Sequence, residues 1–461
     1  MRLPRRTPRT GGLRTLRTRG SHGALVPALV AGPLLVGLGL AGCSDGGVDR
    51  SAAPTPSPFE TLTGPPLTIP APGGAGTLWS TGADQDAELG RTSGQGMEVE
   101  FGRVQATAGR AVVAVAAGGR HSLAVLADGT VLSWGADDSG QLGRGGSPDV
   151  AAPVQAPDGA SGVLHGVVAV AADTNFSMAL RSDGTVVSWG SGDAGQRGIG
   201  PGPAPSGPTE VLAAKGRPHT HVVQIAADGR TELALLSDGT AVSWGANTYG
   251  MLGDGTRDDR AYPVHVKSPS GTRTLGGIRQ IALGGQHGVA ALVTGELLTW
   301  GRNDLGQLGD GSRQDRTLPG PVKGLHGEPV LTDVVQVSAA EKHMYARRSD
   351  GTVAAWGNNS AGQLGDGSTE ERDAPVLVVN SGTGTPLAGV REVVAGEAYG
   401  VAVLDDGSAR TWGANGHGQL GDGDRAPRPV PGLVVGTGGT LFRHVLAVGA
   451  GERHLLLLVG R

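Results

Sequence analysis

The most chemically varied residues of the chain recur beside one small-residue turn. Each of seven copies has a short apolar run that ends near an Ala or a Leu. A turn of a few variable residues then separates it from a second apolar run. Three consecutive copies carry a glutamate there, namely Glu341, Glu397 and Glu452, while Asp173 and Asp228 replace the turn glycine in two other copies. Such acids could give one end of the fold a lopsided negative field for a partner, or be recruited for acid–base chemistry.

The residue directly before the second apolar run varies while its frame stays constant. In chain order it is Arg120, Asn175, Arg230, Gln286, Lys342, Ala398 and Arg453. Variable side chains on a constant scaffold are typical of a contact surface. We therefore predict partner binding by the following turn residues: Arg120, Asn175, Arg230, Gln286, Lys342, Arg453, Glu341, Glu397 and Glu452. The alternative is a solvated rim without a partner.

The next position of each copy favours an architectural role. It is occupied by His121, Phe176, Thr231, His287, His343, Tyr399 and His454. A side chain repeated in this way is expected to support the fold, for example by a hydrogen bond to a neighbouring loop. No acid stands beside the histidines in the pattern, so we expect no catalytic residues. If the chain is instead a lyase or hydrolase, Asp173, Asp228, His287 or Glu341 could be recruited.

Metal and cofactor motifs are missing from the pattern. The chain has no His-Glu-x-x-His, and its single cysteine, Cys43, cannot form a Cys-His cluster. The Gly-Asp-Gly pieces beginning at Gly253, Gly309 and Gly365 lack the alternating carboxylates of a calcium loop, so we interpret them as turns. We expect no metal and no cofactor.

A regular repeat must position these turns. All seven tryptophans lie in one recurring stretch, 55 or 56 residues apart: Trp79, Trp134, Trp189, Trp244, Trp300, Trp356 and Trp412. A fixed period of this size indicates a repeat architecture. Each repeat offers about four short strands bounded by Gly and Asp-Gly turns. The prediction is an all-β, seven-bladed β-propeller in which each tryptophan packs between neighbouring blades.

The two chain ends each supply half a repeat. The N-terminal repeat has only its Trp half, Leu78–Gly90, and the C-terminal one only its first half, Val445–Val459. We predict that together they complete one blade and close the ring, which protects the strand edges.

The repeat also carries a family resemblance. Asp350–Asp366, with Asp-Gly-Thr and Trp-Gly before Gly-Gln-Leu-Gly, and Ala117–Val125, with Ala-Gly before His-Ser, resemble the regulator of chromosome condensation (alpha-tubulin suppressor-like) repeat. The resemblance spans roughly 76–461 and implies a seven-bladed propeller. It suggests guanine-nucleotide exchange, β-lactamase inhibition or plain protein binding. An exported acidic chain would not meet a cytoplasmic GTPase, and the inhibitor uses loop aromatics where this chain has charged or small residues.

The N-terminal region indicates export. Residues 1–42 carry seven arginines and no acid, and they include an apolar run from Ala24 to Leu40. This combination is typical of a signal peptide. Leu40–Cys43 resembles the bacterial lipobox, whose cysteine is lipidated. Residues 43–74, rich in Pro, Ser and Gly, are predicted to be a disordered linker. The expected domains are thus a signal peptide at 1–42, a linker at 43–74 and the propeller at 75–461.

The net charge of the predicted mature chain narrows the range of its possible partners. Residues 43–461 hold 31 basic and 42 acidic residues, which argues against nucleic-acid binding. We predict a monomeric propeller lipid-anchored through Cys43 on the extracytoplasmic face of the cell membrane. It would bind an extracellular protein or cell-wall component without catalysis. The alternative is an extracytoplasmic enzyme acting on a cell-wall or carbohydrate substrate.

Overall fold

The computed structural model describes residues 62–71, 73–91, 96–144, 151–157, 160–203, 205, 207–214 and 216–460, all within the compact unit Thr55–Arg461. The described residues form no α-helix and include two short 3₁₀ segments, η2 (Gln105–Thr107) and η4 (Leu325–Gly327). Within these ranges, no helix is long and apolar enough to span a bilayer. The predicted signal peptide, the lipobox-like segment and Cys43 lie outside the described residues.

The described residues form seven four-stranded antiparallel sheets, which are the blades. Six are continuous in sequence: β3 (Val112–Ala117), β4 (His121–Leu126), β5 (Val131–Gly135), β6 (Ala152–Pro153); β7 (Val167–Ala172), β8 (Phe176–Arg181), β9 (Val186–Gly190), β10 (Thr209–Glu210); β13 (Val222–Asp228), β14 (Thr231–Leu236), β15 (Ala241–Gly245), β16 (Arg260–His265); β17 (Ile278–Gly284), β18 (His287–Leu292), β19 (Leu297–Gly301), β20 (Arg316–Pro321); β21 (Val334–Ala339), β22 (His343–Arg348), β23 (Val353–Gly357), β24 (Arg372–Leu377); β25 (Val390–Gly396), β26 (Tyr399–Leu404), β27 (Ala409–Gly413), β28 (Arg428–Leu433). A small hairpin, β11 (Leu212–Ala213) with β12 (Arg217–Pro218), follows β10.

The seventh blade joins the two ends of the propeller chain. Its strand order is β2 (Met97–Arg103), β1 (Thr77–Ala83), β30 (His454–Val459) and β29 (Val445–Ala450). β1 pairs with β30 over six residue pairs, from Thr77 opposite Val459 to Gly82 opposite His454. The predicted closure by both chain ends agrees with this sheet.

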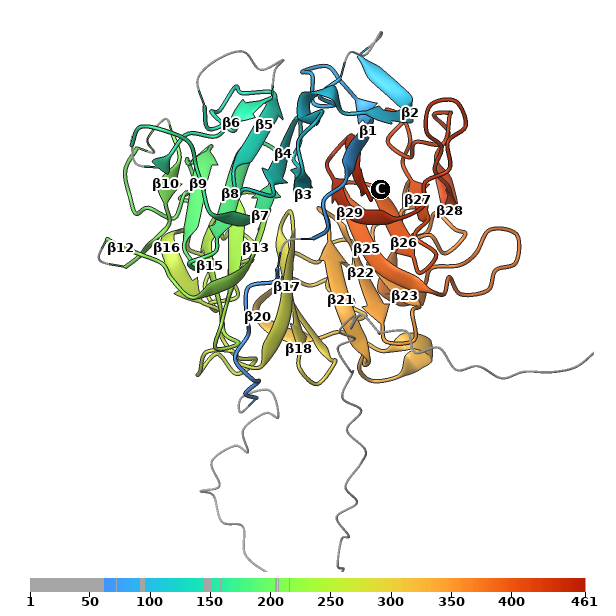
Figure 1. The fold of residues 1–461 in the computed structure, drawn as a ribbon. Helices are drawn as coiled ribbons and strands as arrows, with labels where there is room; N and C mark the ends of the chain where they lie inside the picture. The colour runs from blue at the N-terminus through green and yellow to red at the C-terminus, as the bar shows by residue number, and fades with distance from the viewer. Residues whose placement is uncertain are drawn as a thin grey trace, which may run out of the picture. The chain divides into compact units, whose positions relative to one another are not determined.

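The first strand of each blade faces the centre of a closed ring. β3, β7, β13, β17, β21, β25 and β29 each contact the next in this order, and β29 contacts β3. Figure 1 shows the blades arranged around this centre. The Asp-Gly turns lie at the other ends of the second strands; at one of them, Asp128 Oδ1 accepts from both N and Oγ1 of Thr130, and Gly129 adopts a left-handed φ of 79°.

Six tryptophans pack between blades, as the period predicts. They are fully buried: Trp134, Trp189, Trp244, Trp300, Trp356 and Trp412. Each indole Nε1 donates to a backbone carbonyl in a loop of the preceding blade, at 2.8–3.0 Å, as between Trp356 and Gln307. A buried ring whose polar edge is satisfied in this way links two blades at once.

Trp79 does not occupy the tryptophan position, which corrects the seven-tryptophan period. In the other blades, exemplified by Trp134 opposite Ser122, the tryptophan pairs with the second residue of the second strand. In the closing blade that partner, Leu455, lies opposite Thr81. In the other blades the tryptophan ring packs against a glycine of the preceding blade. At the equivalent glycine, Gly421, the ring of Phe101 from β2 takes that place. Trp79 is only partly buried and stacks edge-on against Phe442 at 5.2 Å.

The end of the predicted linker is also corrected. Residues 62–71, here called the strap, do not stand free of the propeller. Leu62, Leu67 and Ile69 pack against a core cluster that contains Val223 and Ile281, and Leu67 N donates to Ser237 O at 2.8 Å. These apolar side chains fix the strap because burying them removes apolar surface from water. Residues 43–61 of the linker lie outside the described part of the chain.

Candidate functional site

The seven turns between first and second strands meet at one mouth of the ring. Together they line a cavity of about 550 Å³, to which every blade contributes the residue at its inner-strand end, such as Ala117 or Leu283. The turns meet there because all seven inner strands run in the same direction along the central axis. Six of the nine predicted binding residues line this cavity.

The residues that follow these turns are part of the framework. All seven are buried: His121, Phe176, Thr231, His287, His343, Tyr399 and His454. His121 Nε2 lies 2.8 Å from Ser177 Oγ on the next blade, and Tyr399 donates from its hydroxyl to His454 O at 2.8 Å. Burial lowers the pKa of His121 and His287 to about 3, so both rings are neutral at physiological pH. His287 does not line the cavity. The prediction that a lyase or hydrolase could recruit it is therefore wrong.

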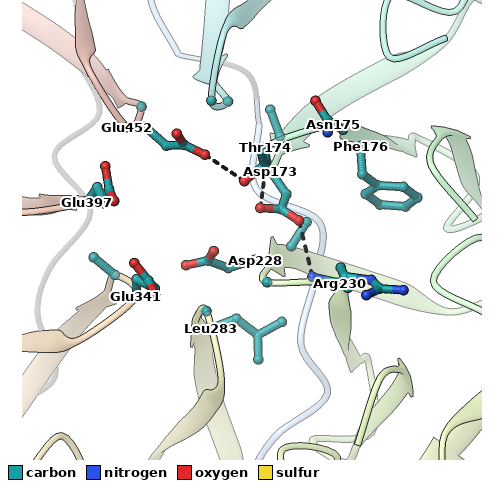
Figure 2. Close-up of a pocket in the computed structure, with 18 of the residues that line it drawn as sticks. Asp173, Thr174, Asn175, Phe176, Asp228, Arg230, Leu283, Glu341, Glu397 and Glu452 are labelled. Carbon is teal, nitrogen blue, oxygen red and sulfur yellow. Dashed lines mark hydrogen bonds between the residues drawn. The ribbon is translucent and has the colours of Figure 1, made fainter. Parts of the chain in front are cut away.

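Six described acidic side chains line the cavity, and Figure 2 labels the five that come from the turns between first and second strands. We call them the acidic mouth: Asp173, Asp228, Glu341, Glu397 and Glu452. The two blades without an acid carry glycines there, Gly118–Gly119 and Gly284–Gly285. A Cβ on Gly119 would lie 2.7 Å from Glu452 Oε1, and one on Gly285 would lie 2.7 Å from Glu341 Cγ. The glycines thus leave room for the neighbouring carboxylates.

Three of these acids have described partners. Thr174 donates from Oγ1 to Glu452 Oε1 at 2.6 Å, and Asp173 Oδ2 accepts from Arg230 N at 3.2 Å. Glu341 pairs with Lys342 at 3.1 Å. The carboxylates of Asp228 and Glu397 form neither a hydrogen bond nor an ion pair with a described residue. The Arg230 guanidinium, 2.7 Å from Asp193, pairs away from both of them.

Burial and like charge oppose ionisation in the mouth. The pKa of Asp228 is raised well above its usual value, first by burial and then by the charges of Asp173, Glu341, Glu452 and Glu397. The pKa of Glu397 is raised first by burial and then by Glu452 and Glu341, while Arg453 and Lys342 oppose the shift. The carboxyl groups of Asp228 and Glu397 are therefore harder to ionise than in water, and a cation placed among them would favour their ionised forms.

One acid near the mouth was missed in the sequence. Glu232 occupies the position of Ser122 and Ser177, is fully buried, and has two carboxyl oxygens without a hydrogen-bond partner among the described residues. Its pKa is raised well above the usual value, first by burial and then by Asp173 and Asp228. A glutamate inside the otherwise apolar run Thr231–Leu236 is the signal that could have revealed it.

The predicted binding residues divide into two groups. Asn175, Arg230, Gln286 and the three glutamates line the cavity. Arg120, Lys342 and Arg453 are not among its lining residues. The Arg120 guanidinium pairs instead with Asp86 at 2.9 Å and Asp138 at 2.6 Å, on the loops outside the centre. Asp193, which sequence reasoning did not select, lines the cavity and pairs with Arg230.

No cluster of three or more metal-ligating side chains poised for a cation occurs in the described ranges. The Gly-Asp-Gly pieces are turns, as predicted. Asp254 Oδ1 accepts from N and Oγ1 of Thr256, and its Oδ2 pairs with Arg260 at 3.0 Å. These carboxylate oxygens are used within the loop.

Comparison with known proteins places the fold in a family. A family model for the RCC1-like domain matches residues 77–457. The ultraviolet-B receptor UVR8 of Arabidopsis thaliana is 30% identical over 358 residues, 77% of each chain. The secretion-regulating guanine nucleotide exchange factor of Bos taurus is 31% identical over 375 residues, 75% of each chain. The crystal structure of human WBSCR16 shares the fold, with a TM-score of 0.69 at 21% identity over 84% of this chain and 100% of that one. The chain belongs to the RCC1-like domain family.

Proposed function

We propose that this chain is a membrane-anchored, extracytoplasmic binding propeller that takes a cationic group of its partner into the acidic mouth. The partner would be an extracellular protein or a cell-wall component that presents lysine, arginine or another ammonium group. The main support is that five blades direct carboxylates into one cavity, while the carboxylates of Asp228 and Glu397 form no ion pair with a described residue.

The charge balance explains why a cation would bind. Each carboxylate raises the cost of ionising the others, and a positive group placed among them would remove that repulsion. The attraction to carboxylates that are partly removed from water is stronger than it would be in open water. Binding should therefore weaken as salt screens the charges and as acid protonates the carboxylates.

Removing charge from the mouth tests this proposal. Asp228→Asn with Glu397→Gln deletes the two unpartnered charges, whereas Asp258→Asn with Glu328→Gln deletes two exposed charges elsewhere. In a pull-down from surface proteins and cell-wall fragments of the source organism, wild type and the second variant should retain a common partner that the first loses. Equal retention by both variants would contradict the proposed site.

The anchoring part of the proposal has its own test. Its support is the apolar segment before the lone Cys43 in a lipobox-like context. Cys43→Ser should leave the protein unprocessed or release it from the membrane fraction. Unchanged processing and fractionation would contradict lipidation without bearing on the acidic mouth.

The raised pKa of Asp228 favours a second candidate function, hydrolysis of a cell-wall or carbohydrate substrate. Glycoside hydrolysis uses one protonated carboxyl as an acid beside an ionised one, and environments that push two carboxyl pKa values apart supply such a pair. Asp228 would be the acid, and Asp173 or Glu341, which line the same cavity, the second carboxyl group. Release of reducing ends from cell-wall fragments by wild type, lost in Asp228→Asn, would support the enzyme. No release by wild type would exclude it for those substrates.

A further inference from the structure

The mouth opposite the acidic one holds a second, smaller cavity. It has a volume of about 430 Å³ and is lined by the second and third residues of β13, β17 and β21, whereas residues at or near the other ends of these strands line the acidic mouth. The strap residues Leu67, Thr68 and Pro70 form one wall. The two cavities therefore lie at opposite ends of the inner strands.

The charged side chains that line this second cavity are Arg279 and Arg347, and no carboxylate is among its described lining residues. Neither arginine forms an ion pair with a described residue. Arg279 donates from Nη2 to Val334 O at 2.6 Å, and its buried Nε has no partner among the described residues. Burial, and then the charge of Arg347, lowers the pKa of Arg279. Two guanidiniums are thus held near each other without an anion between them.

The polar groups around the arginines are already occupied. Gln280 accepts from Val337 N at 3.0 Å and donates to Val337 O at 3.4 Å, and Gln336 bonds Val393 in the same way at 3.0 and 3.1 Å. Arg347 Nε donates to Gln336 Oε1 at 3.4 Å. These bonds fix the wall of the cavity, and the remaining guanidinium N–H groups are its free donors.

We infer that this cavity, here called the arginine pocket, binds a phosphate group through Arg279 and Arg347. Guanidinium forks match the paired oxygens of phosphate, and a phosphate supplies enough acceptor oxygens and charge to engage two of them. Burial lowers the pKa of Arg347, and the nearby charges of Asp405 and Glu392 oppose this shift. Neither lines the pocket, so both leave its entrance to an outside anion. The site is independent of the acidic mouth.

A phosphate group could belong to a free phosphate or to a phospholipid headgroup. Calorimetric titration of the full chain with inorganic phosphate tests the first source. Flotation of the full chain carrying Cys43→Ser with vesicles of phosphatidylglycerol, compared with phosphatidylcholine, tests the second without an acyl chain at that position. Binding of phosphate alone would identify a soluble ligand, and preference for phosphatidylglycerol without free-phosphate binding would identify a headgroup; both outcomes support the pocket.

Charge variants decide whether the pocket is responsible. Arg279→Gln or Arg347→Gln should weaken the observed binding about tenfold, the equivalent of one charged hydrogen bond. Arg273→Gln, which removes an exposed charge outside the pocket, should leave it unchanged. Thermal melts of all three variants show whether each is folded. The inference is overturned if neither phosphate nor phosphatidylglycerol binds, or if the Arg273 variant loses as much binding as the pocket variants.

Discussion

Thr174 and Glu452 are hydrogen-bonded at 2.6 Å across an entire intervening blade. Thr174 follows β7 and Glu452 follows β29, and the blade between them begins with β3. The bond is possible because that blade presents Gly119, whose absent Cβ would lie 2.7 Å from Glu452 Oε1 and 3.0 Å from Thr174 Cα. One small residue therefore lets two more distant blades meet over the cavity.

Gly119→Val tests this arrangement. The added side chain should displace the Glu452 carboxylate and break its bond to Thr174, so binding at the acidic mouth should weaken. Fold stability should fall by about 1–2 kcal/mol, because the added side chain also presses on the backbone of Thr174, whose Cα lies 3.0 Å from the Cβ position. Partner affinity and a denaturant melt measure the two effects. Unchanged affinity, with a melt that confirms folding, would show that this contact does not shape the mouth.

Asp228 should make the fold less stable at neutral pH than at acid pH. Its pKa in the fold is raised, so between the unfolded value of 3.8 and the folded value the native state binds more protons. Its contribution to stability therefore falls as pH rises through that window. Asp228→Asn should raise the melting temperature at pH 7 by about 2 °C or more, and the gain should vanish near pH 3.8. Glu328→Gln is the exposed control and should change neither value.

A ladder of glutamines suggests a second pH-dependent group. Gln224, Gln280 and Gln336 each bridge to the next inner strand through both amide atoms. The same position in the following blade is Glu392, whose carboxyl group forms no hydrogen bond with a described residue. Burial raises its pKa to about 7, against the opposing charges of Arg391 and Arg347. Since the usual value is 4.5, this group's contribution to stability falls as pH rises from 4.5 to about 7.

Glu392→Gln should continue the ladder and remove this pH dependence. The melting temperature of the variant should exceed that of wild type more at about pH 8 than at about pH 4.5, because the wild-type carboxylate is ionised only in the first condition. Gln336→Glu is the converse control and should introduce a similar loss at high pH. A constant difference across both pH values would mean that Glu392 does not titrate as the fold implies.

The tryptophan positions differ in what they contribute. Trp356→Ala removes a fully buried ring and its bond to Gln307, and should cost about 3–5 kcal/mol. Trp79→Ala removes a partly buried ring outside the inter-blade position, and should cost about 1–2 kcal/mol. Denaturant unfolding measures both free energies. Equal losses would contradict the shifted register of the closing blade.

The sequence predicts the architecture because the same pattern of strands and turns recurs in every repeat. Six tryptophans, the Asp-Gly turns and the turn residues each occur at a constant spacing, so one error in one blade cannot change the conclusion. The closing blade has no such protection. Trp79 lies 55 residues before Trp134 and thus imitates the period, although pairing with β30 places Thr81 at the tryptophan position.

The site is less predictable than the fold. The glutamates and the aspartates at the turns converge as their common position requires. The partners of Arg120 could not be foreseen, because Asp86 and Asp138 lie on loops whose paths depend on tertiary packing. Nor could composition reveal that Leu62, Leu67 and Ile69 bind the strap to the propeller, since proline-rich segments usually lack apolar residues in the right places for packing.

The central claim is that the acidic mouth binds a cationic group. Titration calorimetry with hexalysine, at low salt and again at about 0.5 M salt, tests it most directly. Wild type and the Asp258→Asn/Glu328→Gln control should bind the peptide at low salt, and Asp228→Asn/Glu397→Gln should bind at least about tenfold more weakly. Wild-type binding should also weaken at high salt. Equal affinity in all three proteins, or no binding by wild type at low salt, would contradict the account.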